Sequence, residues 1–559
     1  MVSDSATSNS ERSSLSYEVG LADSSLLPWT VGEVLDRAAS TFADRDALVE
    51  AFTGRRWTFQ QLKRDADRTA AGLHQRGIRA GDRVGIWSPN CAEWVITQYA
   101  TAKIGAIMVN INPAYRLDEL EYVLRQSQPK LVISATRYKD TDYERMLAET
   151  GFGSVIFIGS PGWDSLREGA DAAVLSIVTG YANALTFDQP INIQYTSGTT
   201  GFPKGATLSH HNIVNNGFFV GEGVGYSAED RVCIPVPLYH CFGMVMGVLG
   251  AHSHGAAVIL PAPTFDPGLT LRSVQVEKCT SLYGVPTMFI AELAHPQFAE
   301  FDLSSLRTGI MAGSPCPVEV MERVISLMHM SEIAICYGMT ETSPVSTMTS
   351  RNDDLRARTA TIGAVMPHLE VKIIDEQGLV VPRNTPGELC TRGYSVMLGY
   401  WNQPEQTAES VDSARWMHTG DVATMSDDGR LMISGRIKDM IIRGGENIYP
   451  REIEEFFHRH PGIEDVQVIG VPDPKYGEEL MAWIVLRAGA DPITPEDLHQ
   501  FAHGKISRFK VPRYVHLVEA FPMTVTGKVR KIAMREASLD LIGATSVGQT
   551  KTSARPQPY

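Results

Sequence analysis

The stretch YTSGTTGFPKG, residues 195–205, concentrates small polar side chains directly after the strand-like apolar run 191–195. Its glycines let backbone N–H groups approach an anion closely, its hydroxyl groups donate hydrogen bonds, and Lys204 supplies a mobile positive charge. These features predict a loop that holds phosphate groups, and the ligand that we expect is a nucleoside triphosphate. The candidate binding residues of this loop are Thr196, Ser197, Gly198, Thr199, Thr200 and Lys204.

The spacing within this loop differs from that of the Walker phosphate loop. The Walker pattern has four residues between its two glycines and a serine or threonine after its lysine. Here Gly201 comes three residues after Gly198, and Gly205 follows Lys204. Pro203 also disfavours a helix that starts at this point. The apolar runs on both sides argue against a flexible linker, so we expect a phosphate loop of another type.

Composition and charge are those of a large enzyme with more than one domain. The chain has 559 residues, of which 43% are hydrophobic, and this is enough for several cores. Its net charge of −14 argues against nucleic acid or an anionic membrane as the main partner. The seven cysteines are scattered and form no CxxC pair, which predicts neither disulfides nor a zinc site and favours a reducing cytoplasm.

The sequence predicts no membrane span and no secretory signal. No uncharged stretch is long enough to cross a bilayer. The first residues are rich in serine but carry Asp4 and Glu11 and lack an apolar core, which disfavours a signal peptide. The long apolar segment 242–260 contains two histidines and four glycines, so we interpret it as buried structure.

Helical and strand-like patterns alternate along the first two thirds of the chain. Helices are predicted over 31–41 and 59–76, and strands over 83–87, 106–111 and 130–134, which is the rhythm of an α/β fold with parallel sheets. Further strands are predicted over 155–158, 231–235, 257–260, 281–285 and 332–336.

Near Gly387 the pattern changes to short strands and turns, with a hairpin turn predicted at Asp428-Gly429. Residues 440–537 form a compact pattern of their own, with helices over 450–458 and 495–503 and strands over 465–471 and 480–486. We therefore predict a large N-terminal domain over 26–436 and a small C-terminal domain over 437–540. The polar ends, 1–25 and 541–559, are predicted to be disordered tails.

Further along the chain, three short motifs offer groups that suit a nucleotide. In YGMTETSP, residues 337–344, Thr340 and Glu341 bring a hydroxyl and a carboxylate to the end of a strand, which suits a magnesium ion that carries triphosphate. Tyr337 could stack on a purine. The carboxylate of Asp421 in HTGD could accept hydrogen bonds from ribose hydroxyls, and TVTGKVRK places Lys528 in a loop near the C-terminus.

Taken in this order, the motifs closely resemble those of the adenylate-forming superfamily, which includes acyl-CoA synthetases, firefly-type luciferases and the adenylation domains of peptide synthetases. The resemblance covers about residues 30–535 and is closest to bacterial fatty acyl-CoA synthetases and the medium-chain acyl-CoA synthetase group. It implies a large N-terminal domain of stacked α/β sheets that binds ATP and the acyl group, a small mobile α+β C-terminal domain, and a hinge near Lys438. The motifs that carry it are YTSGTTGFPKG, PLYHCFG, YGMTETS, GELCTRG, HTGD, GRIKDMIIRGGENI and TGK.

For the first half-reaction, the resemblance implies that a carboxylate attacks the α-phosphate of ATP and forms an acyl-adenylate and pyrophosphate. Residues 197–204 would grip the β- and γ-phosphates, Glu341 would ligate Mg²⁺ and Thr340 would touch the α-phosphate. Lys528 would bridge the carboxylate and the α-phosphate as charge develops. The nucleoside would be held by Tyr337, Asp421 and Arg436, and the adenine and acyl pocket would be lined by Gly313, Ser314 and Pro315.

For the second half-reaction, the resemblance implies that the small domain rotates about Lys438 and that the CoA thiol attacks the acyl carbonyl. Gly444 and Gly445 would leave room for the pantetheine arm, because any side chain there would narrow its tunnel. His240, in PLYHCFG, would lie beside the reacting carbonyl.

The acid is predicted from the residues expected around the acyl chain. Segments 242–246 and 283–287 and Met339 form apolar surroundings that include Met244, Met246 and Met339, which suits an adaptable alkyl site. Gly338 stands where acetate and propionate enzymes carry tryptophan, so we expect a longer chain and predict a medium-chain fatty acid. A ligase that loads a carrier protein and a CoA ligase for aryl or methylthio acids remain alternatives. A non-catalytic nucleotide-binding module would be expected to lack Lys528 or Glu341, and an amino-acid adenylation domain would offer an aspartate near PLYHCFG.

Overall fold

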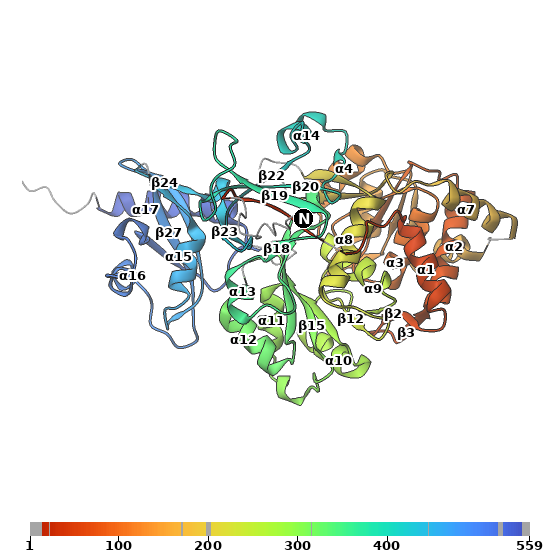
Figure 1. Cartoon of the computed structure of the whole chain (residues 1–559), viewed down its shortest axis with the longest axis horizontal. Helices are drawn as coiled ribbons and strands as arrows, with labels where there is room; N and C mark the ends of the chain where they lie inside the picture. Colours follow the sequence, from red (N-terminus) through yellow and green to blue (C-terminus); the bar gives the residue numbers. More distant parts are fainter. Residues whose placement is uncertain are drawn as a thin grey trace, which may run out of the picture.

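The computed structural model describes residues 14–21, 23–168, 172–196, 203–314, 316–444, 446–523 and 529–549. Figure 1 shows a broad N-terminal part, from red to green, and a smaller C-terminal part in blue at one end. The predicted α/β fold is confirmed: within the described residues, three large sheets and the two-stranded sheet β7-β8 lie in the N-terminal part, and another sheet lies in the C-terminal part.

The first sheet has seven strands in the order β21-β11-β10-β5-β4-β6-β9. Its strands from β10 to β9 run parallel, as predicted, whereas β11 and β21 are added antiparallel. The strand bounds are β4 Arg83–Trp87, β5 Ile107–Asn110, β6 Leu131–Ser134, β9 Val155–Phe157, β10 Pro190–Thr196, β11 Lys204–Ser209 and β21 Gly399–Tyr400.

The second sheet has nine strands in the order β18-β17-β16-β15-β14-β12-β13-β2-β3, and its central strands are parallel. Because β14, β15 and β16 are parallel neighbours, their carboxyl ends meet at one edge, where ligands bind in open α/β sheets. The bounds are β2 Asp46–Glu50, β3 Arg55–Thr58, β12 Arg231–Cys233, β13 Ala257–Leu260, β14 Ser281–Gly284, β15 Thr308–Ala312, β16 Glu332–Gly338, β17 Val345–Met348 and β18 Ala364–Val365.

A buried helical layer packs with these sheets. Every residue of α3 (Ala92–Lys103) is buried, and so is every residue of the π-helix η1 (Phe242–Leu249), which packs beside α8 (His210–Gly223). A helix that is apolar all round belongs in a core, and this confirms the interpretation of 242–260 as buried structure. The other N-terminal helices and short strands are α1 Val31–Thr41, α2 Phe59–Gln75, α4 Leu117–Ser127, β7 Arg137–Tyr138, β8 Thr141–Asp142, α5 Tyr143–Glu149, α6 Pro161–Glu168, α7 Ala172–Ala184, α9 Gly250–His252, α10 Pro267–Glu277, α11 Pro286–Leu293, α12 Val318–Leu327, α13 Leu355–Ala360 and α14 Pro404–Ser410.

The third sheet is antiparallel, with the order β1-β19-β20-β22-β23. Strand β20 matches the predicted run 387–393, and the predicted turn at Gly429 connects β22 to β23 with a positive φ of 84°. The bounds are β1 Tyr17–Val19, β19 Leu369–Ile374, β20 Gly387–Gly393, β22 Met417–Met425 and β23 Leu431–Arg436.

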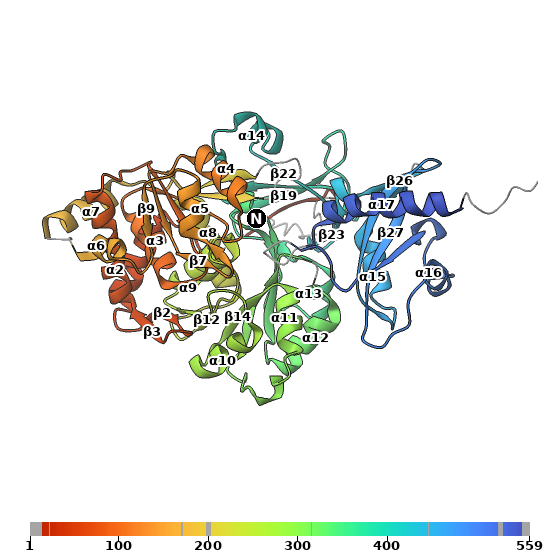
Figure 2. The ribbon, with the colours of Figure 1, turned by 180° about the vertical axis from the view of Figure 1, so that it is seen from behind.

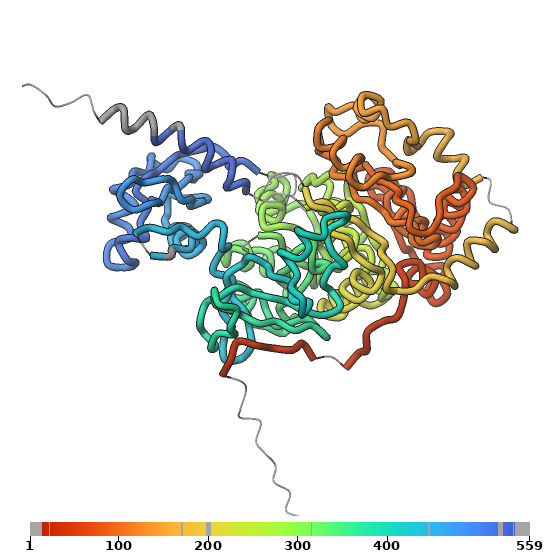
Figure 3. Tube along the Cα trace, turned by 90° about the horizontal axis from the view of Figure 1, so that it is seen from above, coloured from red at the N-terminus to blue at the C-terminus, as the bar shows by residue number. Residues whose placement is uncertain are grey.

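Strand β1 corrects the prediction of a disordered tail over residues 1–25. It pairs with the edge of β19, and the hydroxyl of Tyr17 donates to Glu370 at 2.5 Å. Figure 3 shows this red segment running along the outside of the teal one. The prediction was wrong here because it weighed only the polar composition, whereas a short edge strand is held mainly by backbone hydrogen bonds.

The C-terminal part has its own core and its own sheet, which is antiparallel except that β28 pairs with β27 in parallel. Short helix η4 (Ile437–Asp439) connects it to β23. The bounds are β24 Ile441–Arg443, β25 Glu446–Ile448, α15 Pro450–Phe457, β26 Ile463–Asp473, β27 Gly477–Leu486, α16 Pro495–Ala502, β28 Tyr514–Leu517 and α17 Lys531–Gln549.

Helix α17 corrects the start of the predicted C-terminal tail at residue 541. It continues to Gln549 and lies along the sheet beside β26, as Figure 2 shows. Met534 is fully buried, and Leu541 and Ile542 pack against the same apolar cluster. The predicted start of the tail was wrong because it was based on polar composition alone. Apolar residues at helical spacing continue past residue 540 and pack against the C-terminal domain.

Candidate active site

The predicted phosphate loop connects two antiparallel strands. Thr196, the last residue of β10, pairs with Lys204, the first residue of β11. The predicted absence of a helix after the loop is confirmed, because β11 follows directly. Ser197, Gly198, Thr199 and Thr200 lie outside the described residues, so the structure fixes only the two ends of this loop.

Glu341 lies beside the ends of this loop. It belongs to the short helix η3 (Thr340–Thr342), which follows β16, and both Thr340 and Glu341 are buried. The hydroxyl of Thr196 donates to Glu341 Oε1 at 3.4 Å. The structure thus brings Thr196, Thr340 and Glu341 together from two different sheets.

Tyr400 is a member of this cluster that the sequence did not reveal. It lies in β21, which pairs with β11, and its hydroxyl donates to Glu341 Oε1 at 2.8 Å. The ammonium group of Lys204 lies 4.9 Å from the centre of the Tyr400 ring. Burial raises the pKa of Tyr400, and the negative charge of Glu341 raises it further, so this hydroxyl remains a donor. Its only sequence signal was a Gly-Tyr pair too short to predict a strand.

This cluster fits the magnesium ion that the motif predicted. Glu341 is a buried carboxylate whose two closest side-chain donors, Tyr400 and Thr196, are both neutral hydroxyls. Because neither hydroxyl carries a positive charge, neither forms an ion pair with Glu341. Mg²⁺ prefers one or two carboxylates together with phosphate oxygens and water. When bound, the ion would neutralise charge on the phosphate oxygens.

Tyr337, Asp421 and Arg436 form a second cluster. The hydroxyl of Tyr337 donates to Asp421 Oδ2 at 2.6 Å, and Arg436 Nε donates to Asp421 Oδ1 at 3.0 Å. Asp421 and Arg436 are opposite each other in the β22–β23 register, so the hairpin itself creates this ion pair. Burial raises the pKa of Tyr337, and the charge of Asp421 raises it further. The structure therefore assembles the predicted nucleoside-binding residues around one carboxylate.

Gly313 and Ser314 follow β15 at the same edge. Ala312 pairs with Cys336, so this turn lies next to Tyr337, and Gly313 has a positive φ of 95° that suits glycine. Pro315 lies outside the described residues.

His240 precedes η1 on the expected acyl side. Its Nδ1 accepts a hydrogen bond from the backbone N–H of Phe242 at 3.3 Å. The ring of Phe242 stacks on that of Tyr283, with 5.5 Å between their centres. The apolar segments predicted to surround the acid are thus in contact with each other behind His240.

The structure changes the interpretation of Gly338. A Cβ at this position would lie 1.8 Å from the backbone oxygen of Pro344. The glycine is therefore required by the close approach of the backbone, and its presence does not by itself indicate a deep acyl pocket. The Gly338→Trp exchange would disrupt this turn and cannot report on chain length.

A cavity of about 460 Å³ adjoins Tyr239, the neighbour of His240. Met523 reaches it from the C-terminal part and directly precedes residues 524–528. Tyr239 is buried, and its hydroxyl has no hydrogen-bond partner among the described residues. Other residues that line the cavity include Asn90, Arg116, Lys139, Phe265 and Met288.

The residues predicted for the hinge and the thiol tunnel are placed only in part. Lys438 lies in η4, between the third sheet and the C-terminal sheet. Gly444 has a positive φ of 60°, and a Cβ there would lie 3.2 Å from the ring of Tyr476. Gly445 and Lys528 lie outside the described residues.

Comparison with known proteins identifies the family. The model of the AMP-binding enzyme family matches residues 35–401, and that of the AMP-binding enzyme C-terminal domain matches residues 452–528. YngI of Bacillus subtilis (strain 168), whose name assigns it provisionally to the acyl-CoA synthetases, is 46% identical over 93% of this chain and 99% of its own. Medium-chain acyl-CoA ligase ACSF2 of Rattus norvegicus, named as mitochondrial, is 44% identical over 93% of this chain and 89% of its own.

A solved structure supports the same relationship. The anthranilate CoA ligase AuaEII in complex with anthranoyl-AMP has a TM-score of 0.81 at 26% identity and covers 92% of this chain and 98% of its own. None of the helices that the structure describes has both the length and the apolar character needed to cross a membrane. The chain belongs to the AMP-binding enzyme family, within the acyl-CoA synthetase branch of the adenylate-forming enzymes.

Proposed function

We propose that this protein is a fatty acyl-CoA synthetase that converts a medium-chain fatty acid, ATP and CoA into acyl-CoA, AMP and pyrophosphate through an acyl-adenylate. The observation that carries this proposal is the pair of carboxylate clusters. Glu341 lies with Thr196, Lys204 and Tyr400, and Asp421 lies with Tyr337 and Arg436. The first suits phosphate and Mg²⁺, and the second suits a nucleoside.

In the first step, an oxygen of the fatty acid attacks the α-phosphorus, and the bond to pyrophosphate breaks. Lys204 offers positive charge at the base of the phosphate loop, and Thr340 lies at the strand end where the α-phosphate is expected. Asp421 already accepts from Tyr337 and Arg436, but a carboxylate has about four lone-pair sites and can also accept from ribose hydroxyls. Lys528, in the segment that follows Met523, is the residue that we assign to the bridging charge.

In the second step, the CoA thiol attacks the acyl carbonyl, the bond to the α-phosphate oxygen breaks and AMP leaves. We assign the pivot to Lys438 because it lies between the third sheet and the C-terminal sheet. The large domain then includes strand β1 and ends at residue 436, and the small one begins at 437. Gly444 and Gly445 are assigned to the pantetheine path, and His240 to the neighbourhood of the carbonyl.

Apolar surroundings and the relatives support a medium-chain acid. Phe242, Tyr283 and Met246 pack behind His240, and Tyr283 donates to the backbone oxygen of Met246 at 3.1 Å. At about 0.8 kcal/mol per buried CH₂, each added methylene in such a site increases affinity several-fold. ACSF2 carries medium-chain specificity in its name. We also propose a cytoplasmic location, on the basis of the scattered cysteines and the bacterial relative YngI.

The proposal is tested by measuring pyrophosphate and AMP release with straight-chain acids from acetate to palmitate, each with and without CoA. We expect maximal turnover at medium chain lengths, with AMP release that requires CoA. Adenylate that forms without transfer to CoA would favour a carrier-protein ligase. Turnover with aryl or methylthio acids but not with alkyl acids would favour that alternative, and no turnover with any acid would overturn the proposal.

A further inference from the structure

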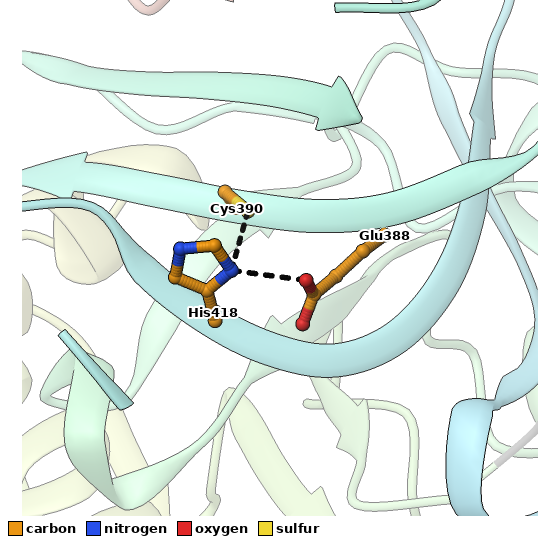
Figure 4. A group of neighbouring side chains, drawn as sticks. All are labelled: Glu388, Cys390 and His418. Carbon is orange, nitrogen blue, oxygen red and sulfur yellow. Dashed lines mark hydrogen bonds and ion pairs between the residues drawn. The ribbon is translucent and has the colours of Figure 1, made fainter. Parts of the chain in front are cut away.

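Three side chains with metal-binding atoms meet on the third sheet, and one of them lies on β22, the strand that also carries Asp421 (Figure 4). Cys390 of β20 and His418 of β22 are directly opposite in the register, and Glu388 lies two residues before Cys390 on the same strand. His418 Nδ1 is 2.9 Å from Glu388 Oε2 and 3.6 Å from Cys390 Sγ. The backbone of the sheet therefore holds a carboxylate, a thiol and an imidazole at one point.

These distances suit a tetrahedral metal. Zinc bonds of about 2.3 Å to sulfur and about 2.0 Å to nitrogen or oxygen place tetrahedral ligands about 3.3–3.6 Å apart. The observed separation of 3.6 Å between Cys390 Sγ and His418 Nδ1 matches this spacing. Glu388 Oε2 would need to move away from His418 Nδ1 by a few tenths of an ångström, and the three ligand atoms all lie within 4.8 Å of one another. Cys390 is buried, while His418 and Glu388 are partly exposed, so a fourth ligand position faces solvent.

The surrounding groups orient these ligands. His418 Nε2 lies 3.7 Å from Asp412 Oδ2, the arrangement in which a carboxylate directs the other ring nitrogen toward a metal. Glu388 Oε1 accepts from the backbone N–H of Gly420 at 3.1 Å, which leaves Oε2 for the metal. Lys372 is opposite Cys390 on β19, but its ammonium group lies over the ring of Trp416 at 4.4 Å.

We propose that Glu388, Cys390 and His418 bind a divalent transition metal of borderline softness, such as Zn²⁺, with water as the fourth ligand. Binding releases the proton of the Cys390 thiol and forms a bond between sulfur and the metal. The metal links β20 to β22 next to Gly420 and Asp421, so it stabilises this part of strand β22. The sequence did not predict the site because the histidine is 28 positions from the cysteine and only the register of the sheet joins them.

The test uses the full chain without nucleotide, titrated with Co²⁺ and Zn²⁺. We expect one Co²⁺ per chain with a near-ultraviolet thiolate-to-metal absorption band, displacement of Co²⁺ by Zn²⁺, and a higher Tm with Zn²⁺. Cys390→Ser should abolish the band and weaken Zn²⁺ binding by at least about 10-fold, and Glu388→Gln should weaken it with the band retained.

The matched control is Cys316→Ser, whose sulfur lies near the backbone oxygens of Met311 and Ser314 and which should keep the band. A band that survives in Cys390→Ser would overturn the proposal, as would Co²⁺ binding without any thiolate band. In either case the cluster would be only a hydrogen bond between His418 and Glu388. Because no ATP is present, the result does not depend on the proposed synthetase activity.

Discussion

Glu341, which follows β16 of the second sheet, and Asp421, in β22 of the third sheet, are both buried carboxylates, yet their partners differ in charge. Glu341 accepts from the neutral hydroxyls of Tyr400 and Thr196, whereas Asp421 is paired with the guanidinium of Arg436 as well as the hydroxyl of Tyr337. A buried carboxylate without an ionic partner is neutralised by a bound cation or by a proton, whereas a paired one is already balanced. We therefore propose that Mg²⁺ binds at Glu341 and that Asp421 accepts hydrogen bonds from the ribose.

The largest effect is expected for Glu341→Gln. The amide keeps the shape but loses the charge that attracts the metal, so the rate of pyrophosphate release should fall by about 100-fold or more. Titration with Mg²⁺ should also show a higher half-saturating concentration. An unchanged Mg²⁺ dependence would contradict the assignment of the metal to Glu341.

A smaller effect is expected for Asp421→Asn. This change leaves Arg436 without its ion-pair partner and weakens the acceptor for ribose, at a cost of about 2 kcal/mol, or about 30-fold in the half-saturating concentration of ATP. The Mg²⁺ dependence measured at saturating ATP should stay as in the wild type. A changed response to Mg²⁺ in Asp421→Asn would contradict the claim that Mg²⁺ binds at Glu341 and the ribose at Asp421.

Two matched tyrosine substitutions test the two carboxylates separately. Tyr400→Phe removes the hydroxyl that donates to Glu341, and Tyr337→Phe removes the one that donates to Asp421, while each ring remains. Each loss should cost about 1 kcal/mol, or about 5-fold. We expect the first change to raise the Mg²⁺ requirement and the second to raise the ATP requirement.

Glu292 is a third buried carboxyl group to compare with Glu341 and Asp421. It is a buried residue of α11, and neither oxygen has a hydrogen-bond partner in the part of the chain that the structure describes. Burial raises its pKa well above the ordinary value of 4.5. The folded state thus keeps a proton that the unfolded state releases, so wild-type stability falls as the pH rises above about 4.5 toward the folded pKa.

Glu292→Gln removes this dependence because the amide is always neutral. We expect the stability of the variant relative to the wild type to grow with pH and to reach on the order of 1 kcal/mol, measured by urea unfolding at several pH values. The control is Glu277→Gln, which breaks ion pairs with Arg56 and Arg231 and should destabilise the protein instead. A difference between Glu292→Gln and the wild type that does not vary with pH would show that Glu292 is ionised in the fold.

Local patterns were sufficient to predict elements whose periodicity matches their burial. Strands β4, β13 and β20 begin and end as predicted, and the turn at Gly429 follows from its Asp-Gly pair. These are short-range properties that hydrophobic spacing and turn chemistry determine.

Contacts that depend on sheet order could not be predicted. Tyr400 reaches Glu341 because β21 pairs with β11, and Cys390 meets His418 because β20 pairs with β22. The motif residues Thr196, Glu341, Tyr337 and Asp421 were found from their types and order, but their hydrogen bonds to one another were not. Gly338 was misinterpreted for the same reason, since the nearby backbone oxygen of Pro344 comes from the returning chain.

The central claim is that Glu341 binds Mg²⁺ and that Asp421 binds the nucleoside. The most direct test measures pyrophosphate release by Tyr400→Phe and Tyr337→Phe side by side, over a range of Mg²⁺ at saturating ATP and over a range of ATP at saturating Mg²⁺. The account predicts that Tyr400→Phe shifts only the Mg²⁺ curve and that Tyr337→Phe shifts only the ATP curve. Equal shifts of both curves in both variants would contradict it.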